Sequence, residues 1–167
     1  MNTSHNFLIF DVESIGLHGE GFAVAGGVFR DGQLLTQFLF ACDPQVARGN
    51  LRDREWVAAH VPRLTPTHDF PYDVREAFVK EWLSLQPIYP GLTMAVECGW
   101  PVEANFLSEC AREHPDFQPY PVHEIASVLL SAGMDPLATY DRRADELPKH
   151  HPTADMKQSA RLLFEGL

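Results

Sequence analysis

The feature that most constrains this chain is a short apolar run that ends in two acids, Phe7-Leu8-Ile9-Phe10-Asp11-Val12-Glu13. Four consecutive apolar residues bounded by polar ones indicate a strand that is buried on both faces. Residues two apart in an extended chain point to the same side, so Asp11 and Glu13 are expected side by side. Two carboxylates held that close repel each other, and a divalent cation is the simplest compensation. A strand that runs out into a solvated turn explains the same residues.

The composition predicts one folded domain, residues 1–167, because a chain of this length with 45% hydrophobic residues can bury a sizeable core. No apolar run is long enough to cross a bilayer, and the first residues lack the features of a secretory signal. The three cysteines, Cys42, Cys98 and Cys110, form no CxxC pair, which argues against a disulfide framework or a zinc site. These features favour a cytoplasmic protein that does not bind membranes.

The formal net charge of −10 argues against general affinity for nucleic acid, because lysine and arginine normally supply the contacts to phosphate. A polyanionic substrate would have to be held by local positive charge or by metal ions.

The distribution of apolar and turn residues predicts an α/β fold. After the first strand, residues 22–29 and 34–42 read as two more strands, joined by an Asp31-Gly32 hairpin turn. The glycines that follow the first strand do not open a helix, so a dinucleotide or P-loop site has little support. Helices are expected over residues 51–61, 72–85, 101–113, 125–132 and 153–164, and short strands over residues 92–98 and 121–123. This order predicts a mixed sheet flanked by helices.

A second acid-containing motif lies near the end of the chain, at His150-His151-Pro152-Thr153-Ala154-Asp155. Asp155 falls in the first turn of the last predicted helix, where the helix dipole favours an acid whatever its function. Either histidine alone is explained equally well as a solvated loop residue. The motif becomes informative in combination with Asp11 and Glu13.

These two motifs resemble those of the DEDDh exonucleases, which include proofreading subunits of bacterial DNA polymerases, RNase T and oligoribonuclease. The first motif, from Asp11 to Leu17, is close to that family's D-x-E-x-x-G-[LM] pattern. In the second, four residues separate His150 from Asp155, which is the spacing of the family and singles out His150 rather than His151. The resemblance follows the order of elements along nearly the whole chain, and implies a ribonuclease H-like fold with a mixed five-stranded sheet.

The middle motif departs from that pattern. The family usually has an N-x-x-F-D-like segment after the fourth strand, and here the sequence runs Glu97-Cys98-Gly99-Trp100-Pro101-Val102-Glu103. The alignment puts Glu103 at the position of the aspartate, and a glutamate reaches one methylene further. Glu97, at the end of the predicted strand, is the alternative, and Glu103 could also be only a helix-terminal acid.

The resemblance implies a site with two Mg²⁺ or Mn²⁺ ions, which prefer hard oxygen ligands. The implied metal ligands are Asp11, Glu13, Glu103 and Asp155, and the implied general base is His150. The residues expected to bind substrate are Ser14, Leu17, Trp100 and Lys149. Arg142, Arg143 and Arg161 flank the last motif and are further candidates for phosphate contacts, while Phe22 is a second candidate for stacking on a base.

The function expected from the resemblance is a metal-dependent 3′–5′ exonuclease. Its partner is expected to be single-stranded nucleic acid with a free 3′ end, with RNA favoured over DNA because the chain is small and acidic. Some members of that family are homodimers, so a homodimer is one expectation. Three alternatives stay open: a catalytically impaired binding module, a metal-dependent phosphohydrolase of small nucleotides, and a scaffold without an active site.

Overall fold

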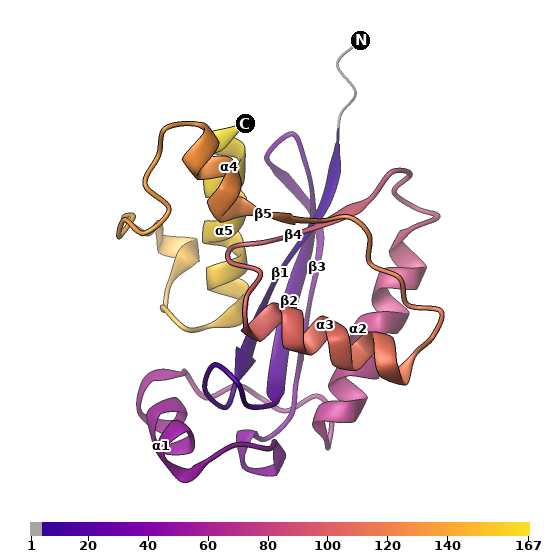
Figure 1. Ribbon diagram of the computed structural model, residues 1–167, viewed down its shortest axis with the longest axis vertical. Coiled ribbons are helices and arrows are strands. Elements are labelled where there is room, and N and C mark those ends of the chain that lie inside the picture. The colour runs from indigo at the N-terminus through magenta and orange to yellow at the C-terminus, as the bar shows by residue number, and fades with distance from the viewer. Residues whose placement is uncertain (1–4) are drawn as a thin grey trace.

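The computed structural model describes residues 5–167, which form a five-stranded sheet between two layers of helices (Figure 1). The strands are β1 (Asn6–Ser14), β2 (Gly21–Arg30), β3 (Gln33–Ala41), β4 (Thr93–Val96) and β5 (Val122–Glu124). Their order in the sheet is β3-β2-β1-β4-β5. The pairs β1–β2 and β2–β3 are antiparallel, and β1–β4 and β4–β5 are parallel. The expected meander and mixed five-stranded sheet are therefore confirmed.

The five α-helices divide between the two faces of the sheet and one end of it. They are α1 (Leu51–His60), α2 (Pro71–Leu85), α3 (Val102–Glu113), α4 (Ile125–Ser131) and α5 (Pro152–Gly166). Helices α2 and α3 cover one face, α4 and α5 cover the other, and α1 lies beyond the end of β1 (Figure 1). No helix among residues 5–167 combines the length and the apolar character that crossing a bilayer requires.

Strand β1 lies at the centre of the sheet, and its alternation decides where the two acids point. Leu8, Phe10 and Val12 pack into the core beneath α2 and α3, whereas Ile9 packs into the core beneath α4 and α5. Because successive side chains point to opposite faces, the odd-numbered acids that follow Ile9 belong to the face that α5 covers. The buried strand predicted from four consecutive apolar residues is confirmed, and the fold assigns its acids to one helix layer.

The hairpin between β2 and β3 turns at Asp31-Gly32, as predicted. Both residues have positive φ, 50° at Asp31 and 79° at Gly32, as a two-residue type I′ turn requires.

The other elements differ from the sequence prediction mainly at their ends. Two short 3₁₀ helices, η1 (Pro44–Val46) and η2 (Ala144–Glu146), were not predicted. Strand β4 ends at Val96, so Glu97 lies just beyond it, and α3 begins at Val102 with Pro101 at its cap.

Candidate active site

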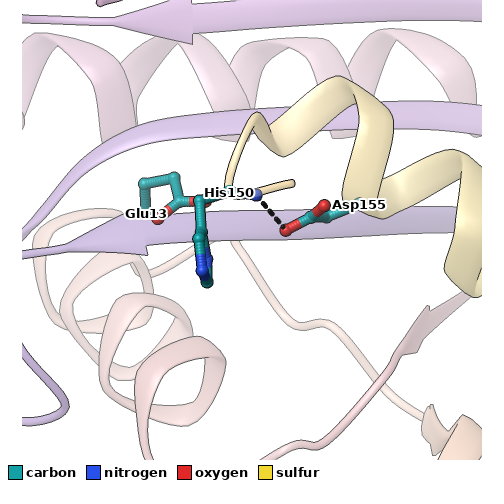
Figure 2. Close-up of side chains that lie close together, drawn as sticks. All are labelled: Glu13, His150 and Asp155. Atoms are coloured by element: carbon teal, nitrogen blue, oxygen red, sulfur yellow. Dashed lines mark hydrogen bonds between the residues drawn. The ribbon is translucent and has the colours of Figure 1, made fainter. Parts of the chain in front are cut away.

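Acids from opposite ends of the chain meet above the carboxyl end of β1. Glu13 comes from β1, Asp155 from the first turn of α5, and His150 from the loop that precedes α5. One possible ligand atom from each of these residues lies within 4.8 Å of the others (Figure 2). The convergence predicted from the first and last motifs is therefore present in the structure.

Asp11 precedes Glu13 by two residues on β1 and lies next to this cluster. Its Oδ2 atom is buried and has no hydrogen-bond partner among residues 5–167. Burial raises the pKa of Asp11 well above its ordinary value, and the neighbouring carboxylates, led by Glu13, raise it further. A buried carboxylate oxygen without a donor needs a cation, so this atom fits a metal ligand.

Glu13 and Glu103 titrate far from their usual range for the same reason. Burial, followed by the charges of Asp155 and Glu103, raises the pKa of Glu13 to about 8. Burial raises the pKa of Glu103 to about 7, and hydrogen bonds from backbone amides, including that of Val12, partly offset the effect. Because Glu103 in the first turn of α3 reaches the backbone of β1, it belongs to the acid cluster.

Glu97 lies at the same cluster. Ser159 of α5 donates a 3.4 Å hydrogen bond from its hydroxyl to Oε2 of Glu97. Glu97 is exposed as a residue, yet partial desolvation of its carboxylate raises its pKa, and the Asp155 carboxylate adds to the effect. The structure therefore brings both candidates for the middle motif, Glu97 and Glu103, to one place.

The carboxylate of Asp155 is held from both sides. Arg142 donates from Nη1 to Oδ1, and the backbone N–H of His150 donates to Oδ2 over 3.2 Å. Arg142 also donates from Nη1 to the carbonyl oxygen of Glu146, at 2.9 Å. Arg142, which the sequence analysis gave as a candidate for a phosphate contact, is therefore paired with Asp155.

The ring of His150 packs edge-on against Trp56 of α1, with the ring centroids 5.2 Å apart. Burial is the main cause of the lowered pKa of His150, and the charges of Lys149, Arg142 and His60 lower it further. The Asp155 carboxylate raises the pKa and offsets part of this shift. A lowered pKa keeps the imidazole neutral near pH 7, which is the form that can accept a proton.

Comparison with known proteins rests on structure alone. No protein-family model matches the chain, and no curated protein matches its sequence. Exonuclease I in an apo form superimposes with a TM-score of 0.60 at 12% identity, over 98% of this chain and 44% of that one. Pop2p of S. pombe, in a form with Mg²⁺ and Mn²⁺ bound, gives a TM-score of 0.63 at 11% identity, over 95% of this chain and 81% of that one. A full-length 3′-exonuclease gives a TM-score of 0.54 at 14% identity, over 98% of this chain and 82% of that one.

The chain has the ribonuclease H-like fold of the DEDD exonucleases. It spans less than half the length of exonuclease I. At these low identities the likeness establishes the fold, and it agrees with the fold that the sequence motifs implied.

The residues expected to bind substrate differ in their surroundings. Leu17 and Trp100 are 64% and 69% exposed, and Lys149 is exposed. Leu17 lines a hollow of about 420 Å³ between the turn after β1 and the start of α1. The Ser14 hydroxyl donates a 2.7 Å hydrogen bond to the carbonyl oxygen of Gly16, so it supports the turn that carries Leu17.

Three other sequence candidates are engaged elsewhere. Phe22 is buried in the core, so the prediction that it could stack on a base is wrong. Arg161 pairs with Glu146 and Glu165, and Arg143 pairs with Glu165. These two arginines tie η2 and α5 together and do not contact the acid cluster.

Sequence reasoning missed Trp56. It is 45% exposed, stacks on His60 with ring centroids 4.6 Å apart, and lies nearly perpendicular to the ring of His150, at an interplanar angle of 78°. The only signal in the sequence was a tryptophan in a short predicted helix that has no clear apolar stripe.

Proposed function

We propose that this chain is a metal-dependent 3′–5′ exonuclease that acts on the free 3′ end of single-stranded nucleic acid, with RNA favoured over DNA. The observation that carries the proposal is the group of Glu13, Asp155 and His150, in which one possible ligand atom of each residue lies within 4.8 Å of the others. Asp11 and Glu103 lie near this group, since the charge of Glu103 helps to raise the pKa of Glu13 and the charges of Glu13, Glu103 and Asp155 help to raise that of Asp11. Two of the solved structures with this fold add support: Pop2p is bound to Mg²⁺ and Mn²⁺, and exonuclease I of E. coli is in complex with single-stranded DNA.

Asp11, Glu13, Glu103 and Asp155 would hold two Mg²⁺ or Mn²⁺ ions. All four offer carboxylate oxygens, the ligands that these hard cations prefer. Such ions, when bound, stabilise the charge on the attacking and leaving oxygens of a phosphoryl displacement. The unpartnered, buried Oδ2 atom of Asp11 is the atom with the strongest need for a cation.

His150 would act as the general base. Its neutral imidazole can take the proton of the attacking water, and its ring is held by Trp56 on one side while its backbone is held by Asp155. Leu17, Trp56 and Trp100 present exposed apolar surface near the site, which suits contact with nucleotide bases. Lys149 would contact a phosphate, since it lies near enough for its charge to lower the pKa values of both His150 and Glu97.

This assignment answers the objection from net charge. An acid cluster in a chain of net charge −10 repels a phosphodiester, and divalent ions offset the local negative charge where the phosphate has to bind. Substrate binding is therefore expected to depend on metal. The cluster also contains Glu103, so the altered middle motif does not by itself argue for an impaired, binding-only module.

The test is digestion of oligonucleotides labelled at the 5′ end, as single and double strands of RNA and of DNA, in Mg²⁺, in Mn²⁺ and in EDTA. The expected result is a ladder of products shortened from the 3′ end. The variant Asp11→Ala should produce no ladder, and a circular single strand, which has no 3′ end, should not be degraded by the wild-type protein. The absence of a ladder from the wild-type protein in both metals would overturn the proposal. Hydrolysis restricted to mononucleotides would favour a phosphohydrolase of small nucleotides.

A further inference from the structure

Glu97 follows directly after β4, the strand that pairs with β1, and the register of these two strands relates it to Asp11. The parallel pair β1–β4 places Ile9 opposite Ala95, and continuing that register by two residues brings Asp11 level with Glu97. Ile9 and Ala95 both pack into the core beneath α5, so the side chains two residues further along belong to the same face. The register therefore directs the side chain of Glu97, which leaves β4 at its end, toward the side of the sheet that carries Asp11.

Two contacts support the orientation of Glu97 toward the cluster. Ser159, which is buried on α5, donates its hydroxyl hydrogen bond to Glu97 Oε2. The backbone carbonyl oxygen of Glu97 accepts a 3.0 Å hydrogen bond from the N–H of Ala126 on α4, which fixes the main chain at this residue. An independent sign of a ligand is the buried Oδ2 atom of Asp11, which has no protein partner.

Arg142 supplies a positive charge at the same place. Its Nη1 atom contacts Asp155 Oδ1 and the carbonyl oxygen of Glu146. The Glu146 side chain is in turn held by Arg161 through two hydrogen bonds, of 2.7 and 3.0 Å. The side chains of Arg161 and Glu146 are both largely buried. Because Arg142 bonds to the backbone of Glu146, this buried pair fixes its position.

Once Glu97 is counted as a fifth ligand, the charges of the site balance only when Arg142 is included. No other lysine or arginine among residues 5–167 lies within 4.0 Å of Asp11, Glu13, Glu97, Glu103 or Asp155. Five ionised carboxylates and one guanidinium carry a net charge of −4, which two divalent ions neutralise. A site with the fifth carboxylate but without the arginine would keep an uncompensated negative charge next to the substrate phosphate.

We propose that Glu97 is a fifth carboxylate ligand of the metal centre and that Arg142 is the fixed counter-ion that offsets its charge. The proposal rests on the proposed function in assuming that the cluster binds divalent ions. It assigns Glu97 and Glu103 joint roles, instead of making one the replacement for the other. Arg142 acts through Asp155 and is therefore a positioning residue.

The test is calorimetric titration of the full chain with Mn²⁺, without substrate, for Glu97→Gln, Arg142→Gln and the double variant. Glu97→Gln is expected to weaken Mn²⁺ binding about tenfold, because a ligand and a negative charge are lost while Arg142 remains. Arg142→Gln is expected to tighten binding several-fold. The double variant is expected to recover most of the affinity that Glu97→Gln loses, which independent residues would not do. Arg142→Lys keeps the charge and is expected to bind Mn²⁺ as the wild type does, so it serves if Arg142→Gln does not fold.

The matched controls are Glu76→Gln and Lys80→Gln, which neutralise the same kinds of charge in an exposed 3.0 Å ion pair on α2. Both are expected to bind Mn²⁺ as the wild type does. Unchanged or tighter binding by Glu97→Gln, with wild-type protein that binds Mn²⁺ and degrades oligonucleotides, would overturn this inference alone. A wild-type protein that binds no Mn²⁺ would overturn the proposed function together with it.

Discussion

The backbone N–H of His150 donates a 3.2 Å hydrogen bond to Oδ2 of Asp155, so the proposed base and a proposed metal ligand hold each other in place (Figure 2). His150 has a φ of 62°, in the left-handed region that side chains other than glycine rarely adopt. Such a conformation costs about 1–3 kcal/mol and persists where surrounding contacts determine it. Here those contacts are Asp155 on the backbone and Trp56 on the ring.

Replacing His150 tests its role as a base. His150→Ala is expected to lower exonuclease activity by about 10²–10⁴-fold, the usual contribution of general base catalysis, while Mn²⁺ binding persists. The neighbouring His151→Ala is the control and is expected to keep most activity. Since a ring nitrogen of His150 lies within 4.8 Å of ligand oxygens, loss of Mn²⁺ binding in His150→Ala would show that it is a ligand instead.

Trp56 is expected to set the pH range in which His150 works. Trp56→Ala exposes the imidazole to water and removes its packing, so the pKa of His150 rises toward its ordinary value. The acid limb of the pH–rate profile should then move to higher pH, with less than about a twofold loss of rate at pH 7 and a larger loss below about pH 6. Trp56→Phe should restore most of the rate.

A suitable control is Tyr72→Ala on α2, because Tyr72 is exposed to a similar extent and also lies beside a histidine, His114. An unchanged pH profile in Trp56→Ala would mean that α1 does not influence the base.

Asp11→Asn separates stability from metal binding. Removing a buried, repelled carboxylate should raise the thermal midpoint of the metal-free protein by about 2–4 °C, the shift that 1 kcal/mol produces in a domain of this size. The same variant should lose the increase in midpoint that Mn²⁺ gives the wild type. The exposed Asp116→Asn should change neither quantity. A metal-induced increase that survives in Asp11→Asn would exclude Asp11 as a ligand.

The raised carboxyl pKa values predict how the stability of the metal-free protein depends on pH. The folded chain holds protons on Glu13 and Glu103, with pKa values of about 8 and about 7, that the unfolded chain releases near 4.5. This contribution to stability is complete below pH 4.5 and is lost as the pH rises through the folded-state values. Between about pH 5 and 8, the free energy of unfolding should therefore fall, by up to about 1 kcal/mol per pH unit for each group.

Urea denaturation in EDTA at several pH values measures this slope. Saturating Mn²⁺ should reverse it, because metal binds the deprotonated carboxylates. A flat profile in EDTA would contradict the proposed burial of the acids.

Gly16 is expected to tolerate no side chain. It has a φ of 70°, and a Cβ atom there would lie 2.2 Å from Oδ2 of Asp53 on α1. Gly16→Ala should lower the free energy of unfolding by about 1–3 kcal/mol and also reduce activity, because it displaces the helix that carries Trp56. Gly91→Ala has a similar φ of 73° but open space around it, so only the backbone strain should remain. Equal effects of the two substitutions would show that the contact with α1 is unimportant.

Local patterns carried much of the prediction. The apolar run and the two-residue spacing placed Asp11 and Glu13 on one face of a buried strand, and the Asp31-Gly32 turn was predicted from two adjacent residues. The His150–Asp155 spacing needed only a loop followed by a helix. These features depend on residues a few positions apart.

Contacts between distant residues were not predictable in this way. The sequence could not choose between Glu97 and Glu103, because the end of β4 and the start of α3 place both near Asp11, where the charge of each raises its pKa. Arg142, expected at a phosphate, pairs with Asp155 because η2 holds it there. Trp56 reaches His150 only because α1 folds back over the end of β1.

The sequence by itself determined which residues could do chemistry and on which side of their own element they stand, since the periods of helix and strand are set by the backbone. Only the tertiary structure decided which of those residues share a site, because strand register and helix packing are chosen by the whole core at once.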